Sequence, residues 1–250
     1  MNKVSYKNAV FYYSFSDCAY IDGYDTKFNY ASIESCSEEF YNALLERGWR
    51  RFGEMFFAPF CDYCKKCISI RQIISDFKLS KNHKRIIKNN SHIKIEIQNP
   101  IYDPQKIILY NKYHKIMNIK KGWDYNQIDK SRYIYMFIEG QMSFGKEICY
   151  YIDDKLIGVA FVDILNHTKS MSAIYFFYDH DYSYLSLGTF SILKQVEIAK
   201  MLDIKYLYPG YWIKDHYSLG YKERFKPFEY LVNRPNIYEE PIWKLYKGEI

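Results

Sequence analysis

A run of three strand-like segments that leads directly into a helix is the feature that most restricts how this chain folds. Residues 146–152, 155–165 and 169–179 are rich in β-branched and aromatic residues, and short polar turns separate them. Residues 187–202 follow with apolar side chains at near-helical spacing. The pattern predicts an antiparallel meander, then a helix, and then further strands at 204–212 and 228–233.

The N-terminal part of the sequence has a different pattern. The first thirty residues are aromatic and irregular, and residues 18–23 are expected to form a short strand and a turn. Ser35, followed three residues later by Glu38, predicts a capped helix that Gly48 ends. Further segments are expected as helices (81–89 and 104–116) and as strands (55–60, 68–74 and 93–98).

The order of the later elements resembles the N-acetyltransferase fold, in which a meander of strands runs into the N-terminus of a helix. The expected fold class is α/β in the broad sense (α+β), with an antiparallel or mixed sheet flanked by helices. We expect two domains. The smaller, over 1–100, contains a cysteine motif and a basic helix, and the larger, over 101–250, is N-acetyltransferase-like.

The net charge of +6 is modest for 250 residues, but it is unevenly distributed. Six Lys or Arg residues and no acid lie between Lys78 and Lys94. Four of them share one face of the predicted helix 81–89: Lys81, Lys84, Arg85 and Lys88. Such a face suits sequence-independent contacts with RNA phosphates, and an ordinary solvated helix face is the alternative.

No apolar run is long enough to cross a bilayer, and the N-terminus lacks the apolar core of a signal peptide. We therefore expect a cytoplasmic protein without membrane contacts. Six cysteines in a chain of this length do not make a disulfide scaffold. Cys61, Cys64 and Cys67 form a CxxCxxC motif, which is expected in a loop between two strands and suits a metal or cluster better than a disulfide.

Five segments, read together, resemble the protein N-terminal aminoacyltransferases. That family includes arginyltransferases and shorter bacterial enzymes that transfer leucine. The similarity runs from about Cys18 to about Leu231, and the compact length resembles the leucyl branch. The segments are RGWRRFGEMFFAPFCDYCKKCISIR (47–71), SKNHKRIIKNN (80–90), SAIYFFYD (172–179), SLGTFSILKQVEIAK (186–200) and YLYPGYWI (206–213).

The resemblance implies that an amino acid, most simply leucine, is transferred from aminoacyl-tRNA to the α-amine of proteins that begin with Asp or Glu, which marks them for degradation. The donor ester is already activated, so the reaction needs no ATP or coenzyme A, and no cofactor is expected for the chemistry. An α-amine with an ordinary pKa of about 7.7–8.0 is partly neutral near physiological pH. Positioning and oxyanion stabilisation can then supply most of the acceleration without a strong general base.

The region of similarity also supplies candidate site residues. The predicted catalytic group is Tyr178, Asp179, Ser186 and Gly188, whose local amides suit the tRNA 3′ end or the oxyanion, with a plain turn and helix cap as the alternative. The candidates for the cation that binds the acceptor carboxylate are Arg50, Arg51, Arg71 and Lys222, and a structural ion pair fits each equally well. Cys18 lies at the start of the region of similarity and is the candidate fourth ligand, with Cys61, Cys64 and Cys67, of Zn²⁺ or an iron-sulfur cluster. Reduced thiols are the alternative.

Two other functions fit part of the sequence. Arginyl transfer needs an acidic pocket for the donor side chain, whereas the aromatic residues around Phe176, Phe177 and Tyr211 favour an apolar pocket. A non-catalytic RNA-binding protein with a cysteine-bound metal explains residues 61–94, but it does not explain the similarity of residues 172–231.

Overall fold

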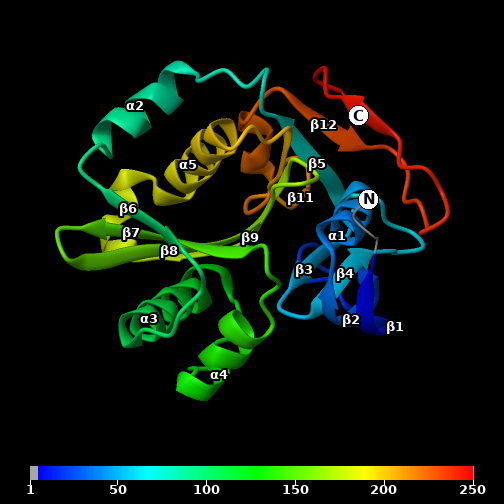
Figure 1. Ribbon diagram of the computed structural model, residues 1–250, viewed down its shortest axis with the longest axis horizontal. Helices are drawn as coiled ribbons and strands as arrows, with labels where there is room; N and C mark the ends of the chain where they lie inside the picture. The colour runs from blue at the N-terminus through cyan, green and yellow to red at the C-terminus, as the bar shows by residue number, and fades with distance from the viewer. Residues whose placement is uncertain (1–4, 250) are drawn as a thin grey trace.

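The computed structural model describes residues 5–249, which form two β-sheets with helices packed against them (Figure 1). The smaller sheet has the order β1-β2-β4-β3. Its strands are β1 (Tyr6–Asp17), β2 (Asp25–Cys36), β3 (Arg50–Phe52) and β4 (Met55–Pro59), and helix α1 (Glu38–Glu46) packs on it. The cysteine motif lies between β4 and β5, as the sequence predicts.

Three expectations for the N-terminal region are wrong. Residues 18–23 form bends and the expected turn but no strand. The first thirty residues are not irregular from Tyr6 on, because β1 and β2 pair with each other along their whole length. Ser35 does not cap helix α1, because it still belongs to β2 and lies opposite Lys7. Ser37 is the cap instead, and its Oγ accepts a hydrogen bond from the Phe40 amide at 3.3 Å.

The larger sheet has nine strands in the order β13-β12-β5-β10-β9-β8-β7-β6, with β11 paired to β5. The strands are β5 (Ile68–Ile73), β6 (Lys94–Gln98), β7 (Gly145–Ile152), β8 (Lys155–Leu165), β9 (Ser170–Tyr178), β10 (Tyr206–Tyr208), β11 (Tyr211–Trp212), β12 (Phe228–Leu231) and β13 (Trp243–Leu245). The predicted meander is confirmed as β7, β8 and β9, which pair antiparallel in sequence order.

Strand β10 is the one that defines the fold class. Helix α5 (Leu187–Met201) follows β9 and brings the chain back, so that β10 lies parallel to β9. The pairing covers only Ser170 to Ser172 on β9, and no strand among residues 5–249 pairs with the rest of β9 on that side. This is the organisation expected of an N-acetyltransferase-like α+β fold. An antiparallel meander is followed by a helix and then by a short strand, β10, which pairs parallel with β9 and then separates from it.

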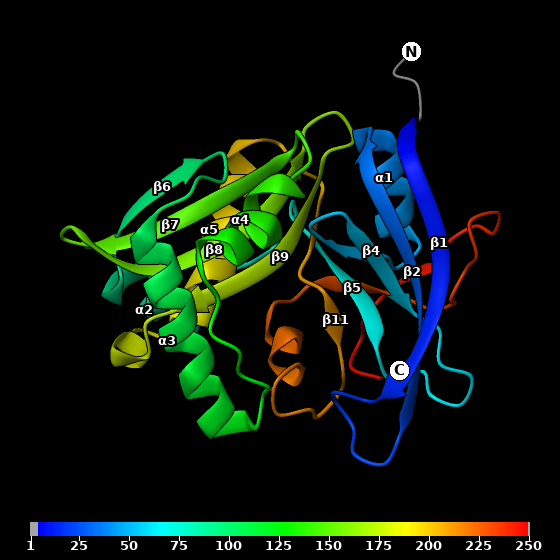
Figure 2. The same ribbon diagram turned by 90° about the horizontal axis from the view of Figure 1, so that it is seen from below.

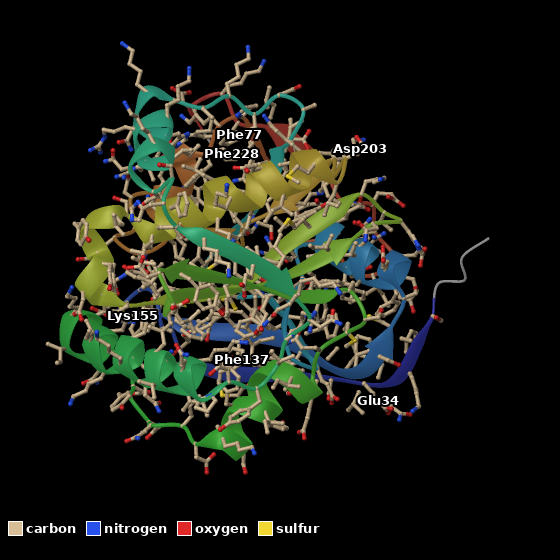
Figure 3. All side chains as sticks on the ribbon, turned by 60° about the vertical axis from the view of Figure 1, so that its left-hand side comes forward. Glu34, Phe77, Phe137, Lys155, Asp203 and Phe228 are labelled. Carbon is tan, nitrogen blue, oxygen red and sulfur yellow. The ribbon has the colours of Figure 1, made fainter. Side chains whose placement is uncertain are left out.

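Helices cover both faces of the larger sheet (Figures 1 and 2). Helix α5 lies on one face with α2 (Lys81–Asn89), and α3 (Pro104–Lys121) and α4 (Lys130–Ile134) lie on the other, where a π-helical turn (Tyr135–Glu139) follows α4. Phe77 is buried in the first layer and Phe137 in the second (Figure 3). Asp103 caps α3 as predicted, but the helix extends past the expected end near residue 116.

The boundary between the two sheets lies between β4 and β5. Strands β5 and β6 precede residue 100 but belong to the larger sheet. The predicted domains 1–100 and 101–250 stay a prediction, and a division at residue 100 would separate β5 and β6 from the other strands of the larger sheet. Ile97, on the edge strand β6, is 48% exposed. No helix within residues 5–249 is long and apolar enough to cross a membrane.

Candidate functional site

Two buried cations bind main-chain carbonyls at and just after β10, where this strand separates from β9. Arg50, the first residue of β3, is 5% exposed. Its Nη1 donates hydrogen bonds to Ser172 Oγ (3.2 Å) and to the Tyr208 carbonyl (3.4 Å). Because Ser172 and Tyr208 are the last paired residues of the two strands, the guanidinium lies at the narrow end of the gap between them. Its Nε and Nη2 have no hydrogen-bond partner among residues 5–249.

Lys222 is the second cation and lies in the 3-10 helix η3 (Gly220–Arg224). It is 7% exposed, and its Nζ donates to the Tyr211 carbonyl at 2.7 Å. Gly210 leaves room for this contact, since it has a φ of +100° and a Cβ added there would lie 3.1 Å from Lys222 Nζ. Burial, followed by repulsion from Arg50, lowers the pKa of Lys222 to about 7.

Neither cation is neutralised by the protein. Within the described residues, no carboxylate forms an ion pair with Arg50 or Lys222. A buried charge without a partner is unfavourable, so two such charges side by side are typical of a site where a ligand supplies the anion. The predicted acceptor-binding residues Arg50 and Lys222 are therefore brought together in a form that suits a carboxylate.

The other two candidates for the acceptor carboxylate already hold carboxylates of this chain. Arg51 forms a buried two-pronged ion pair with Asp163, and its guanidinium also donates to two main-chain carbonyls. Arg71 Nε donates to Glu229 Oε2 at 2.7 Å, and its guanidinium lies between two aromatic rings. These contacts fit the structural alternative for both residues.

The predicted catalytic group lies at the end of β9 and the start of α5. Asp179 is 2% exposed and forms ion pairs with Lys112 (2.5 Å) and Lys155 (3.3 Å). Burial favours a higher pKa for Asp179. Hydrogen bonds from Lys112, from the Asp181 amide and from Lys155 outweigh burial and hold the pKa of Asp179 below its usual value. The carboxylate is thus engaged by lysines of the chain, a contact that the sequence analysis missed because α3 and β8 supply the two lysines.

Backbone geometry distinguishes the start of α5. Ser186 adopts a left-handed conformation with a φ of +55° and makes no capping hydrogen bond with its side chain. The Phe190 amide donates to the Ser186 carbonyl, so the amides of the three residues between them point out of the helix end. A Cβ added at Gly188 would meet nothing within 4 Å. Catalytic roles for Tyr178, Asp179, Ser186 and Gly188 stay predictions.

The basic face of α2 points away from the core. Ile86 is buried and packs in the layer that contains α5, whereas all four predicted tRNA-binding side chains are exposed. Ser80 caps the helix as predicted, and His83 completes the capping box. The four exposed residues are Lys81, Lys84, Arg85 and Lys88.

The four cysteines proposed as metal ligands lie near one another. Cys61, Cys64 and Cys67 are in the loop between β4 and β5, Cys18 follows β1, and all four are half-buried. Burial raises the pKa of Cys67 to about 12, and the neighbouring Cys18, Cys64 and Cys61 thiols add to the rise. Over residues 5–249, no group of three or more His, Cys, Asp or Glu side chains is arranged around a metal position. Soft thiolate ligands fit Zn²⁺ or an iron-sulfur cluster, and ligation stays a prediction.

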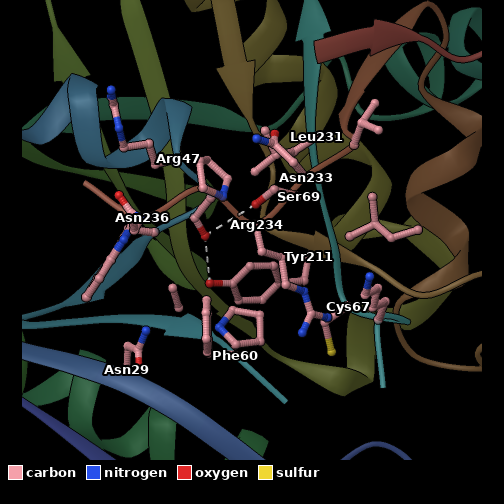
Figure 4. A pocket seen from close by; sticks show the side chains of 18 of the residues that line it. Asn29, Arg47, Phe60, Cys67, Ser69, Tyr211, Leu231, Asn233, Arg234 and Asn236 are labelled. Carbon is pink, nitrogen blue, oxygen red and sulfur yellow. Dashed lines mark hydrogen bonds between the residues drawn. The ribbon is translucent and has the colours of Figure 1, made fainter. Parts of the chain in front are cut away.

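A cavity of about 500 Å³ opens beside the Tyr211 ring (Figure 4). The Tyr211 hydroxyl donates to the Gly48 carbonyl at 3.0 Å, and the Tyr211 carbonyl accepts from Lys222 on the other side. The loop after β12, the cysteine loop and the end of α1 form the remaining walls. Its polar lining includes Asn29, Arg47, Lys65 and Arg234.

Comparison with known proteins agrees with this geometry. The family model described as "Arginine-tRNA-protein transferase, C terminus" matches residues 105–232, and the one described as "Arginine-tRNA-protein transferase, N terminus" matches residues 16–85. The chain belongs to the arginine-tRNA-protein transferase family. The matched ranges of this family contain Arg50, Lys222 and the four cysteines.

Curated members of the arginine-tRNA-protein transferase family align with nearly the whole chain. An aspartate/glutamate leucyltransferase from Helicobacter hepaticus is 51% identical over 238 residues, which cover 95% of this chain and 98% of that protein. One from Campylobacter jejuni is 38% identical over 228 residues, covering 91% and 95%. The predicted family resemblance is confirmed.

Solved structures resemble this transferase only distantly. The crystal structure of FemX has a TM-score of 0.48 and 9% sequence identity, with 86% of this chain and 84% of that chain covered. The L-PGS structure from Bacillus licheniformis has a TM-score of 0.45 and 8% identity, with 73% and 59% covered. At these scores, neither structure bears on the function of this transferase family member.

Proposed function

We propose that this protein transfers leucine from its tRNA to the α-amine of proteins whose first residue is Asp or Glu. The observation that carries the proposal is the pair of buried cations without a carboxylate partner in the described chain, Arg50 at the gap between β9 and β10 and Lys222 at the Tyr211 carbonyl. The relatives named aspartate/glutamate leucyltransferase, which align with 91–95% of this chain, support the same donor and acceptor.

Arg50 and Lys222 would bind the side-chain carboxylate of the acceptor. The two Arg50 nitrogens without partners, Nε and Nη2, lie on one edge of the guanidinium and match the two oxygens of a carboxylate. Lys222 would add a second positive charge, and its pKa would rise when the carboxylate arrives. An uncharged first residue would leave both cations buried and unpaired, so the same contacts would give selectivity.

The reaction then requires little from the protein beyond positioning. The acceptor nitrogen attacks the carbonyl carbon of the aminoacyl ester, an amide bond forms, and the bond to the ribose oxygen breaks. The proton lost by the amine goes to that oxygen, which leaves as the ribose hydroxyl of the tRNA. The outward-pointing amides at the start of α5 remain candidates to stabilise the oxyanion.

Contacts with the body of the tRNA are assigned to α2. Its exposed basic face would bind phosphates through charge, and the contact would weaken as salt concentration rises. In Figure 1, α2 and the loop after β12 lie on opposite sides of the molecule, so a ligand that touches both must be long. A metal or cluster at the four cysteines would hold the β4–β5 loop to the turn after β1.

A transfer assay tests the proposal directly. Purified protein is supplied with tRNA, synthetases, labelled Leu or Arg, and peptides that begin with Asp, Glu, Lys or Ala. We expect leucine to be transferred to the Asp and Glu peptides alone. No labelling of any peptide would refute the activity, labelling by Arg alone would make the protein an arginyltransferase, and use of Lys but not Asp would refute the acceptor assignment.

A further inference from the structure

The cavity beside Tyr211 has no role in the function proposed above. We propose that it binds the 3′-terminal nucleotide of the donor tRNA, that is, an unpaired base with its 5′-phosphate. The inference rests on the proposed function, because that function requires a tRNA whose single-stranded end reaches the acceptor site. Three features of the cavity support it: its charge, its aromatic walls and its position.

The charge of the cavity favours an anion. Arg47, Lys65 and Arg234 line it, and none of the lining residues within the described chain is Asp or Glu. Two of these cations have unused donors, because Arg47 Nε and Arg234 Nη2 are buried without a hydrogen-bond partner among residues 5–249. A phosphate would satisfy such donors, whereas the charged α-amine of a peptide would be repelled.

The walls of the cavity suit a base. Trp49, Phe60 and Tyr230 line it, and Phe60 is 39% exposed. An aromatic ring stacks on any base, and stacking combined with cations is how proteins bind single-stranded nucleic acid without reading its sequence. The cavity volume of about 500 Å³ lies within the range of small-molecule sites and exceeds the needs of an Asp or Glu side chain.

The aromatic surface continues outside the cavity on the β1–β2 hairpin. Tyr13 lies opposite Asn29, which lines the cavity, and both belong to the same face of the sheet. Tyr13 and Phe15 are 66% and 61% exposed and contact each other edge to face at 5.6 Å. Lys27 Nζ lies 5.7 Å from the Phe15 ring and 5.9 Å from the Phe60 ring. The nucleotides before the last one would follow this surface.

The position of the cavity links the donor to the acceptor. Tyr211 separates the cavity from Lys222, since its ring lines the cavity and its carbonyl accepts the lysine hydrogen bond. A nucleotide seated there would bring its ester-bearing ribose next to the acceptor cations.

Charge reversal in the cysteine loop tests the assignment with a matched control. Lys65 and Lys66 are both exposed and adjacent, each lies next to a cysteine of the motif, and only Lys65 lines the cavity. Binding of the tetranucleotide 5′-phospho-ACCA is measured by calorimetry at low salt. We expect Lys65→Glu to weaken binding about tenfold and Lys66→Glu to change it less than about twofold.

A second pair of variants tests the stacking. Phe60→Leu keeps an apolar side chain but removes the ring, and Tyr63→Leu does the same at a fully exposed position of the same loop that does not line the cavity. We expect Phe60→Leu alone to weaken binding of ACCA, about fivefold or more. Both variants are compared with the unmodified protein for their thermal unfolding midpoint.

Each outcome decides between the cavity and the overall function. Equal effects within each pair, or no binding of ACCA by the unmodified protein, would overturn the assignment while leucyl transfer stands. If Lys65→Glu leaves ACCA binding unchanged and raises the KM for an Asp peptide, the cavity belongs to the acceptor instead. If ACCA binding changes in the variants as expected but the unmodified protein transfers no leucine, the proposed function is refuted and the cavity is an RNA-binding site.

Discussion

The Lys222 ammonium and the Arg50 guanidinium donate to main-chain carbonyls only three residues apart, those of Tyr211 and Tyr208, although both side chains are buried and neither has a carboxylate partner within the described chain. Such an arrangement is costly in the empty protein, and it becomes favourable when an anion enters. The cost is a form of preorganisation, because the two cations are held in place by Ser172, Tyr208 and Tyr211 before the ligand arrives.

Loss of either cation is expected to act on the acceptor. Arg50→Gln and Lys222→Met should each lower kcat/KM for Asp and Glu peptides roughly 30-fold or more, mainly by raising KM. This corresponds to a loss of about 2 kcal/mol of binding free energy. Arg224→Met is the control, since Arg224 lies in the same 3-10 helix as Lys222 but is exposed. Steady-state kinetics with both peptides check this, and a fall in kcat at unchanged KM would contradict the assignment.

The depressed pKa of Lys222 predicts a pH dependence of stability. In the unfolded chain a lysine keeps its proton up to a pH of about 10.5, but in the folded protein Lys222 keeps it only up to about 7. The unfolded state therefore binds more protons between these values, and the contribution of Lys222 to stability rises with pH by at most about 1.4 kcal/mol per unit.

Lys222→Met removes this titration. We expect the unfolding free energy of the unmodified protein, minus that of Lys222→Met, to increase between pH 7 and pH 9. Urea unfolding at three pH values measures the difference, and titrations shared by both proteins cancel. A difference that is constant over this range would show that Lys222 keeps an ordinary pKa in the folded state.

The buried pair Arg51–Asp163 is expected to matter for stability. Arg51→Met would leave the Asp163 carboxylate buried without its partner and should cost about 3–5 kcal/mol. The double variant Arg51→Met with Asp163→Leu removes both charges and should recover much of that loss. Urea unfolding of Arg51→Met, of Asp163→Leu and of the double variant gives the coupling free energy between the two side chains. Additive losses of unfolding free energy would show that the pair does not act as a unit.

The elements predicted correctly are those specified by local pattern. The meander β7–β9 follows from β-rich segments and polar turns, and Ser80 and Asp103 cap α2 and α3 where the sequence places caps. The β1–β2 hairpin was missed because β1 contains an unbroken apolar and aromatic run over residues 10–13, so pairing between the strands decides its structure. The short helix α4 and the π-helical turn after it give too few residues for a periodic signal.

The two arginines of the site show why the partners of a site residue cannot be predicted without the three-dimensional structure. Arg50 and Arg51 are adjacent on β3, so their side chains leave the strand on opposite sides. One meets Asp163 on β8, more than a hundred residues away in the sequence, and the other meets the gap between β9 and β10. Sequence reasoning named both arginines and had no means of separating them, because each partner is set by long-range packing.

The basic face of α2 predicts a salt-dependent contact with tRNA. Lys84→Glu should weaken tRNA binding. It should also reduce, by about one, the slope of the logarithm of the binding constant against the logarithm of the salt concentration. Lys115→Glu, on the exposed side of α3, changes the net charge equally and should have less than about a twofold effect. Filter binding from 50 to 200 mM salt tests this, and equal effects of the two variants would remove α2 from the tRNA contact.

The four clustered thiols predict a metal or cluster that stabilises the loop between β4 and β5. Protein purified without oxygen should contain Zn or Fe, and Cys64→Ser should lose most of it and unfold at a lower temperature. Cys36→Ser is the control, because Cys36 ends β2 and is not one of the four candidate ligands. Elemental analysis and thermal unfolding with and without a chelator provide the measurements. Absence of both metals from the unmodified protein, with an unfolding midpoint that the chelator does not change, would identify the four cysteines as plain thiols.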